Sequence, residues 1–299
     1  MSCNLTNQPF NYAEIFIPLG YGILSILVYV LLTFLIVRKK KLHQPFYYYF
    51  IFLGAMNSIL WVDLFFLFRL PRMPDLCVFF MTTFNQSSVF LNITIILFTV
   101  TSIGQLLVMM LISFSRFLAV VWPTKQQIVP SPTKCILSIL VISLACSSVV
   151  FSWTAQYTKG PDGYPLFKTE QGWPYVAPVY IISPVGAVCS ILVPICTLYA
   201  VYILMKGKKQ KRNFVELKLL LTSFCFSLSS VSLSIYMIGI FLSKYILQDD
   251  DLSAWVAGIR EILLDLATLP AGWLLILTNR DVRSIFTNKK KFLSSQSTF

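Results

Sequence analysis

Charged residues are scarce in this chain of 299 residues. Asp, Glu, Lys and Arg together make up 12% of the sequence and hydrophobic residues 57%, whereas a soluble globular domain is about 25% charged. Such a composition excludes an ordinary water-soluble fold. It predicts a chain that is solvated by lipid.

Histidine is rarer still, since His43 is the only one. A histidine cluster for a metal and a serine–histidine pair inside the membrane are therefore both excluded. The sequence also contains no glycine-rich phosphate loop and no paired-aspartate protease arrangement, and the interior of its long apolar stretches contains no lysine to which retinal could be linked. We therefore expect no enzymatic activity and no cofactor.

Seven apolar stretches are long enough to cross a bilayer, because a helix of roughly 20 mostly apolar residues spans about 30 Å of hydrocarbon. They are residues 15–37, 46–68, 90–121, 135–155, 179–205, 217–243 and 255–278. The segment that precedes the third stretch is expected to lie above the membrane, because the uncharged run is too long for one crossing. We predict an all-α membrane protein with seven transmembrane helices, in which residues 1–14, 15–278 and 279–299 form an N-terminal segment, the membrane domain and a tail.

Positive charge is distributed unevenly between the two ends of the predicted spans. Eighteen of the 24 Lys and Arg residues lie at the end that also contains the tail, and cytoplasmic loops retain such charge. The N-terminus is therefore predicted outside, where Asn4 starts a glycosylation sequon. The net charge of +12 lies in short loops and not in a basic domain, so we expect contact with membrane lipids and none with nucleic acid.

Cysteine gives one candidate disulfide. Five of the seven cysteines fall in predicted spans and are interpreted as small packing residues. Only Cys3 and Cys77 can meet an oxidising exterior, and a bridge between them would tie the N-terminus to the start of the third span. Two free thiols are the alternative.

Polar residues inside the spans lie on defined helix faces. The third span aligns Ser102, Gln105, Met109, Ser113 and Arg116 on one face. The last span aligns Glu261, Asp265, Thr268, Gly272 and Asn279. Ionisable groups in a membrane cost a few kcal/mol each and usually face the bundle interior. The acidic stripe is either a hydrogen-bonded node between helices or a site for an ion, a proton or a ligand.

Two groups of motifs resemble known receptors. Arg116, Ala119 and Pro123 have the spacing of the Asp-Arg-Tyr motif of rhodopsin-like G-protein-coupled receptors, with Ser115 and Phe117 in place of the acid and the tyrosine. The runs Phe-Arg-Leu-Pro at 68–71, Asp-Leu-Ala-Thr-Leu-Pro at 265–270 and Asn-Arg-Asp-Val-Arg at 279–283 resemble nematode serpentine chemoreceptors of class gamma, or a relative such as class V. The resemblance also implies a short amphipathic helix over residues 281–292.

The resemblance implies a chemosensory receptor in the plasma membrane, with sensory cilia as a candidate location. A small-molecule ligand would bind in the outer half and a heterotrimeric G protein at the cytoplasmic face. The ligand-binding residues expected from helix phase are Ser102, Gln105, Ser183, Glu261 and Asp265. The residues expected at the G protein are Arg116, Pro123, Lys208, Lys209, Lys211, Arg212 and Glu216.

Several features depart from the rhodopsin-like pattern. The second outer loop, residues 156–177, has no cysteine, the sixth span has no Cys-Trp-x-Pro run, and the seventh has no Asn-Pro-x-x-Tyr. Arg116 lacks an adjacent carboxylate, which makes Glu216 the candidate partner. The alternative function is an ion-coupled transporter or ligand-gated channel that uses Glu261 and Asp265, although the chain shows no internal repeat and no matched pair of broken spans.

Overall fold

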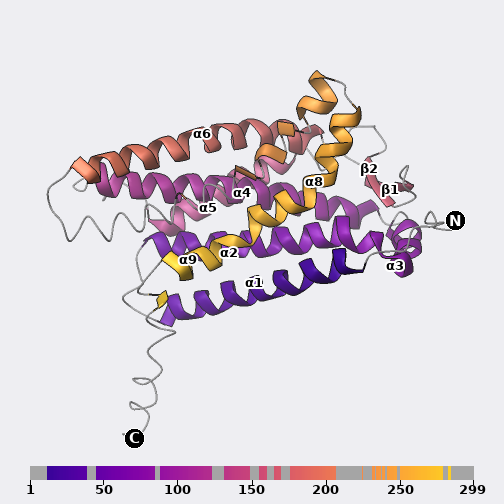
Figure 1. The fold of residues 1–299 in the computed structure, drawn as a ribbon, viewed down its shortest axis with the longest axis horizontal. Coiled ribbons are helices and arrows are strands. Elements are labelled where there is room, and N and C mark those ends of the chain that lie inside the picture. Colours follow the sequence, from indigo (N-terminus) through magenta and orange to yellow (C-terminus); the bar gives the residue numbers. More distant parts are fainter. Residues whose placement is uncertain are drawn as a thin grey trace, which may run out of the picture.

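The computed structural model describes residues 12–38, 45–84, 88–122, 131–148, 155–159, 165–169, 176–206, 224, 231–232, 234–236, 238–239, 241–247, 250–278 and 282–283. Its long helices run along one common direction and form a bundle (Figure 1). The helices are α1 (Ala13–Arg38), α2 (Pro45–Leu64), α3 (Pro74–Phe79), α4 (Ser88–Val121), α5 (Pro132–Ser147), α6 (Val176–Lys206), α8 (Asp250–Thr268) and α9 (Pro270–Thr278). Short helical turns extend some of them: η2 (Phe65–Arg69), η3 (Leu70–Arg72), η4 (Phe80–Phe84) and η7 (Leu242–Ile246).

Helices form here because lipid offers no partner for a backbone N–H or C=O group. Four described segments are long and apolar enough to cross a membrane by themselves: Ile15–Arg38, Pro45–Arg72, Val89–Val121 and Pro184–Ile203. Proline marks where several helices begin, as at Pro45, Pro132 and Pro270, because the first helical residue needs no N–H donor. The first, second, third and fifth predicted spans are thereby confirmed to within a few residues.

The remaining spans differ more from expectation. The predicted end of the fourth span at residue 155 is wrong, because Ala155 begins a strand and the described helix α5 ends at Ser147. The seventh span is broken at Leu269, so α8 and α9 together cover it. The sixth predicted span lies mostly outside the described residues, but its Tyr236 is buried in one apolar cluster with Cys189 of α6 and Leu264 of α8.

Helix α4 lies at the centre of the bundle and packs against α2, α5 and α6, whereas α1 packs against α2 and α9. The predicted inward face of α4 is confirmed, since Ser102, Gln105, Met109, Ser113 and Arg116 are all buried. On α1 and α6, by contrast, many large apolar side chains are exposed on the surface of the bundle. Such a surface is suited to hydrocarbon and not to water.

A two-stranded antiparallel hairpin, β1 (Ala155–Lys159) and β2 (Pro165–Thr169), was not predicted. It lies at the same end of the bundle as α3 and the start of α1 (Figure 1). Tyr157 of β1 is buried, and its hydroxyl donates to the Leu67 carbonyl at 3.1 Å. Its ring packs edge-on against the Phe80 ring, with 5.8 Å between the ring centres. The hairpin is therefore anchored to η2 and η4.

Only two residues of the predicted amphipathic helix after the seventh span are described. Val282 and Arg283 are both helical; Val282 is buried in the core, and Arg283 is exposed.

Candidate functional site

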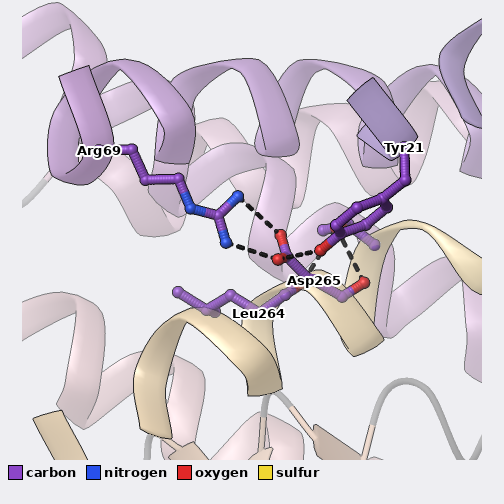
Figure 2. A network of polar contacts seen from close by, with 5 residues as sticks. Tyr21, Arg69, Leu264 and Asp265 are labelled. Carbon is purple, nitrogen blue, oxygen red and sulfur yellow. Dashed lines mark hydrogen bonds and ion pairs between the residues drawn. The ribbon is translucent and has the colours of Figure 1, made fainter. Parts of the chain in front are cut away.

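Asp265 of α8 is the centre of a polar site between three elements. The Arg69 guanidinium of η2 donates from Nη1 to Asp265 Oδ1 at 3.1 Å and from Nη2 to Oδ2 at 2.5 Å. The Tyr21 hydroxyl of α1 also donates to Asp265 Oδ2. Figure 2 shows both side chains directed at the carboxylate from different helices. A bidentate arginine–carboxylate pair is among the stronger hydrogen-bonded contacts in proteins.

The local structure explains why Arg69 faces inward. Arg69 is the last residue of a single π-helical turn, Phe65–Arg69, that extends α2, and Pro71 follows in a 3-10 turn. A π turn alters the phase of the helix, and such turns are frequent at functional sites. The side chain of Arg69 is 7% exposed and that of Asp265 14% exposed, so the two charges neutralise each other away from solvent.

A groove of about 690 Å³ lies beside this polar site, between α1 and the α8–α9 segment. Tyr21, Arg69 and Asp265 form its polar wall, and its other lining residues are mainly apolar. On its rim, Leu24 is 55% exposed and Leu266 is 50% exposed. These side chains belong to the lipid-facing surface, so the groove, which we call the α1–α8 groove, opens toward the membrane.

The break between α8 and α9 is bridged by two other helices. Pro270 starts α9, and the last carbonyls of α8 lack the usual partners within the helix. Gln105 Nε2 of α4 donates to the Ala267 carbonyl at 2.6 Å, and the Tyr29 hydroxyl of α1 donates to the Thr268 carbonyl at 2.9 Å. Asn57 Nδ2 of α2 in turn donates to the Tyr29 hydroxyl at 3.1 Å.

The predicted ligand-binding residues are thus brought together only in part. Gln105 meets α8 two residues from Asp265. Ser102 is fully buried on the same face of α4, and neither Ser102 Oγ nor Gln105 Oε1 has a hydrogen-bond partner within the described part of the chain. Ser183 and Glu261 belong to α6 and α8, but their side chains lie outside what the structure describes. Among the described residues, no group of three or more His, Cys, Asp or Glu side chains is placed to hold a metal.

Tyr21 and Arg69 were not predicted as site residues. Arg69 had a signal, because it is an arginine at the end of an apolar span and within the motif at 68–71. The sequence gives little indication of a role for Tyr21, because a single tyrosine among apolar residues also suits a lipid-facing position. Their meeting with Asp265 depends on how three helices are rotated against one another.

The opposite end of α4 holds Arg116, which is 7% exposed. Its guanidinium carbon lies 4.4 Å from the centre of the Phe46 ring, at the start of α2. Ser115, in the position of the motif's acid, donates its hydroxyl to the Ile112 carbonyl of its own helix at 2.8 Å. Phe117, in the position of the tyrosine, packs against Tyr199 of α6, with 6.0 Å between the centres of the two rings.

Arg116 is therefore held by an aromatic face in this structure, which is a favourable electrostatic contact. Other residues predicted at the G protein lie outside the described residues: Pro123, Lys208, Lys209, Lys211, Arg212 and Glu216. The pairing of Arg116 with Glu216 stays a prediction.

Cys77 is buried at the end of the bundle that contains α3, and it is disulfide-bonded. Four other described cysteines form no disulfide: Cys135, Cys146, Cys189 and Cys196. Cys3 and Asn4 lie outside the described residues, so the Cys3–Cys77 bridge and the glycosylation site stay predictions.

The order and packing of the described helices match those of the rhodopsin-like seven-transmembrane fold. The crystal structure of squid rhodopsin matches with a TM-score of 0.66 and 13% identity, and the match covers 96% of this chain and 87% of that chain. No curated protein sequence matches. The model of the Srg family chemoreceptors matches residues 15–286, and the chain therefore belongs to the Srg chemoreceptor family. The predicted seven-transmembrane helical fold and the resemblance to serpentine chemoreceptors are confirmed, and the orientation of the termini stays a prediction.

Proposed function

We propose that this chain is a chemosensory G-protein-coupled receptor of the plasma membrane. It binds a small molecule in its outer half and activates a heterotrimeric G protein at its cytoplasmic face. Membership of the Srg chemoreceptor family supports the general function. The observation that supports the ligand site is the Tyr21–Arg69–Asp265 network on the wall of the α1–α8 groove.

The groove favours an apolar ligand with one hydrogen-bonding group. Its volume of about 690 Å³ falls in the range of small-molecule sites, about 300–1,000 Å³. Apolar walls bind the body of such a ligand, and the polar network orients its polar end. Because the rim residues Leu24 and Leu266 face hydrocarbon, the ligand enters from the outer leaflet. Ser102, Gln105, Ser183 and Glu261 are the further ligand contacts proposed from helix phase.

The cytoplasmic end of the bundle is the proposed G-protein surface. Arg116 lies at this end of α4, beside the start of α2. The basic cluster Lys208, Lys209, Lys211 and Arg212, together with Pro123 and Glu216, extends the surface. This orientation follows from the distribution of Lys and Arg, and it places Asn4 and the proposed Cys3–Cys77 bridge outside.

An ion-coupled transporter is the weaker function. Transport would require Asp265 to bind a coupling ion, but both of its carboxylate oxygens accept hydrogen bonds from Arg69, and Oδ2 also accepts one from Tyr21. Arg69 is an opposite charge that already neutralises the carboxylate.

The test is ligand-evoked G-protein dissociation in cultured cells, measured against a panel of small molecules that includes amphipathic compounds. Wild type is compared at matched surface levels with Arg116→Ala and with Leu266→Trp, which places an indole at the rim of the α1–α8 groove. Leu277→Trp is the matched control, since Leu277 is exposed on α9 and does not line the groove. We expect Arg116→Ala to abolish the response, Leu266→Trp to reduce ligand potency, and Leu277→Trp to behave as wild type.

Ligand-evoked current or uptake without G-protein dissociation would overturn the receptor function in favour of transport. An unchanged potency in Leu266→Trp would place the ligand elsewhere in the bundle and leave the receptor function standing.

A further inference from the structure

A second groove lies between α4, α5 and α6, and the proposed chemosensory ligand does not use it. Its volume is about 840 Å³, and its lining is mainly apolar, with Met110 and Phe114 from α4, Ile142 from α5 and Leu192 from α6. We call it the α4–α6 groove. Its residues in α4 and α6 fall in the halves of those helices that lie toward Arg116 and Lys206, which is the end predicted to be cytoplasmic.

The groove exists because α5 and α6 both pack on α4, and the side chains that they direct into the space between the three helices are small. Ser138 of α5 and Cys196 of α6 line the hollow where larger residues would fill it. Phe114, Ile142 and Leu192 on its rim are between 45% and 49% exposed. In a bilayer these exposed apolar groups meet lipid chains, so the groove is open to the hydrocarbon of one leaflet.

Among the described residues that line the α4–α6 groove, one is charged, and it is a cation. Lys134 lies in the first turn of α5, which begins at Pro132. When the apolar part of the α4–α6 groove is in hydrocarbon, the side chain of Lys134 therefore lies at the membrane surface. None of the described lining residues is acidic. The cytoplasmic leaflet is rich in anionic lipids, and basic sites between helices on that side bind their head groups.

We infer that the α4–α6 groove binds an anionic phospholipid of the inner leaflet. An acyl chain occupies the space between Phe114, Ile142 and Leu192, and the head-group phosphate pairs with the ammonium group of Lys134. A soluble phosphate does not fit this site, because almost all of its lining is apolar and faces hydrocarbon. The lipid and the chemosensory ligand therefore occupy different grooves, which lie between different helices of the bundle.

The test is photocrosslinking of the full chain in phosphatidylcholine nanodiscs that contain a small fraction of a probe lipid. The probe carries a diazirine in one acyl chain and has either a phosphatidylserine or a phosphatidylcholine head group. Crosslinked residues are mapped by mass spectrometry. We expect the serine probe to label the lining of the α4–α6 groove about fivefold more than the choline probe, the factor that one basic residue near an anionic surface supplies.

Two charge variants test the role of Lys134. Lys134→Gln is expected to lower labelling by the serine probe to the level of the choline probe. Lys206→Gln is the matched control, since Lys206 is an exposed lysine at the end of α6 and does not line the groove; its labelling is expected to equal that of wild type. Equal labelling by both probes, or equal effects of the two variants, would overturn the proposal.

Cys196→Phe fills the groove itself and is expected to remove labelling of its lining by both probes. If this variant does not reach a folded state, the two lysine variants still decide the proposal, because both replace exposed side chains. Crosslinks of the serine probe spread evenly over the outer surface of the helices would also contradict it, since they would indicate ordinary contact with the bilayer.

Discussion

Asp265 and Arg69 form a largely buried ion pair, and removal of one partner leaves the other charge without compensation. Breaking such a pair costs about 3–5 kcal/mol of folding free energy. We therefore expect Asp265→Asn to lower the thermal unfolding temperature of the purified receptor and its surface level in cells. Asp75→Asn, which changes an exposed carboxylate of α3, is the control and should leave both measurements near those of wild type.

The double variant Arg69→Met with Asp265→Leu separates the structural contribution of the pair from its contribution to ligand binding. Because replacement of both charges by apolar groups leaves no buried charge, we expect most of the stability to return. The ligand response should stay lost, since the polar wall of the α1–α8 groove is gone. A double variant that responds as wild type would show that the pair is only a connection between helices.

Arg116 and Phe46 make a second contact whose loss can be measured. A desolvated cation–π contact contributes about 2 kcal/mol or more. The proposed contact of Arg116 with a G protein requires the guanidinium to leave the Phe46 ring. We therefore expect Phe46→Leu to raise G-protein activation in the absence of ligand, and Phe46→Tyr to resemble wild type. Basal G-protein dissociation at matched surface levels is the measurement.

Phe50→Leu is the matched control for this prediction, because Phe50 is as buried as Phe46 and one helical turn away, with its ring near Tyr29. Both leucine variants lose a similar amount of packing. Equal basal activity in the two would indicate that the Phe46 ring does not restrain Arg116.

The junction of α8 and α9 depends on side chains from neighbouring helices. Gln105 satisfies the Ala267 carbonyl, and an unsatisfied buried carbonyl costs about 1–3 kcal/mol. We expect Gln105→Leu to lower stability by an amount in that range, measured as thermal or denaturant unfolding in detergent. Ser102→Ala should be neutral, because Ser102 Oγ has no partner within the described residues. The reverse order of the two effects would contradict this assignment.

The sequence predicted which segments become helices better than which side chains meet. A run of apolar residues such as 15–37 has no alternative to a helix in lipid, and α1 follows it closely. The membrane does not require the hairpin at 155–169 in this way. Its ten strand residues pair with each other, and Tyr157 anchors the hairpin to η2. The break at Leu269 follows from Pro270, but the side chains that hydrogen-bond the free carbonyl groups at the end of α8 come from α1 and α4.

The candidate site shows the same limit. Asp265 could be predicted as a site residue because a carboxylate deep in a span needs a partner. Arg69 is 196 residues away along the chain, and no local pattern connects the two. Arg116 could likewise be identified from its motif, but its contact with Phe46 depends on the packing of α2 against α4.

At the scale of the whole bundle, α4 connects the region of the α1–α8 groove to the end that holds Arg116. Gln105 of α4 contacts α8 near Asp265, and Arg116 lies three helical turns further along the same helix. A ligand moves a two-state equilibrium from 1:99 to 99:1 only if it prefers the active state by about 5.5 kcal/mol. In the proposed receptor such coupling would act in both directions, so a bound G protein would raise ligand affinity by the factor by which ligand raises G-protein affinity.

This reciprocity gives a prediction for the purified receptor. We expect addition of nucleotide-free G protein to lower the Kd of an activating ligand by about 5–150-fold, the usual range of such coupling. Arg116→Ala should bind the ligand with the affinity of the uncoupled wild type and show no shift, because the outer groove is intact and the inner contact is lost. A GTP analogue that releases the G protein should return wild type to its low-affinity state. A wild-type receptor that activates the G protein but shows no affinity shift would contradict a shared two-state equilibrium, and would mean that the groove and Arg116 act on different conformational changes of the bundle.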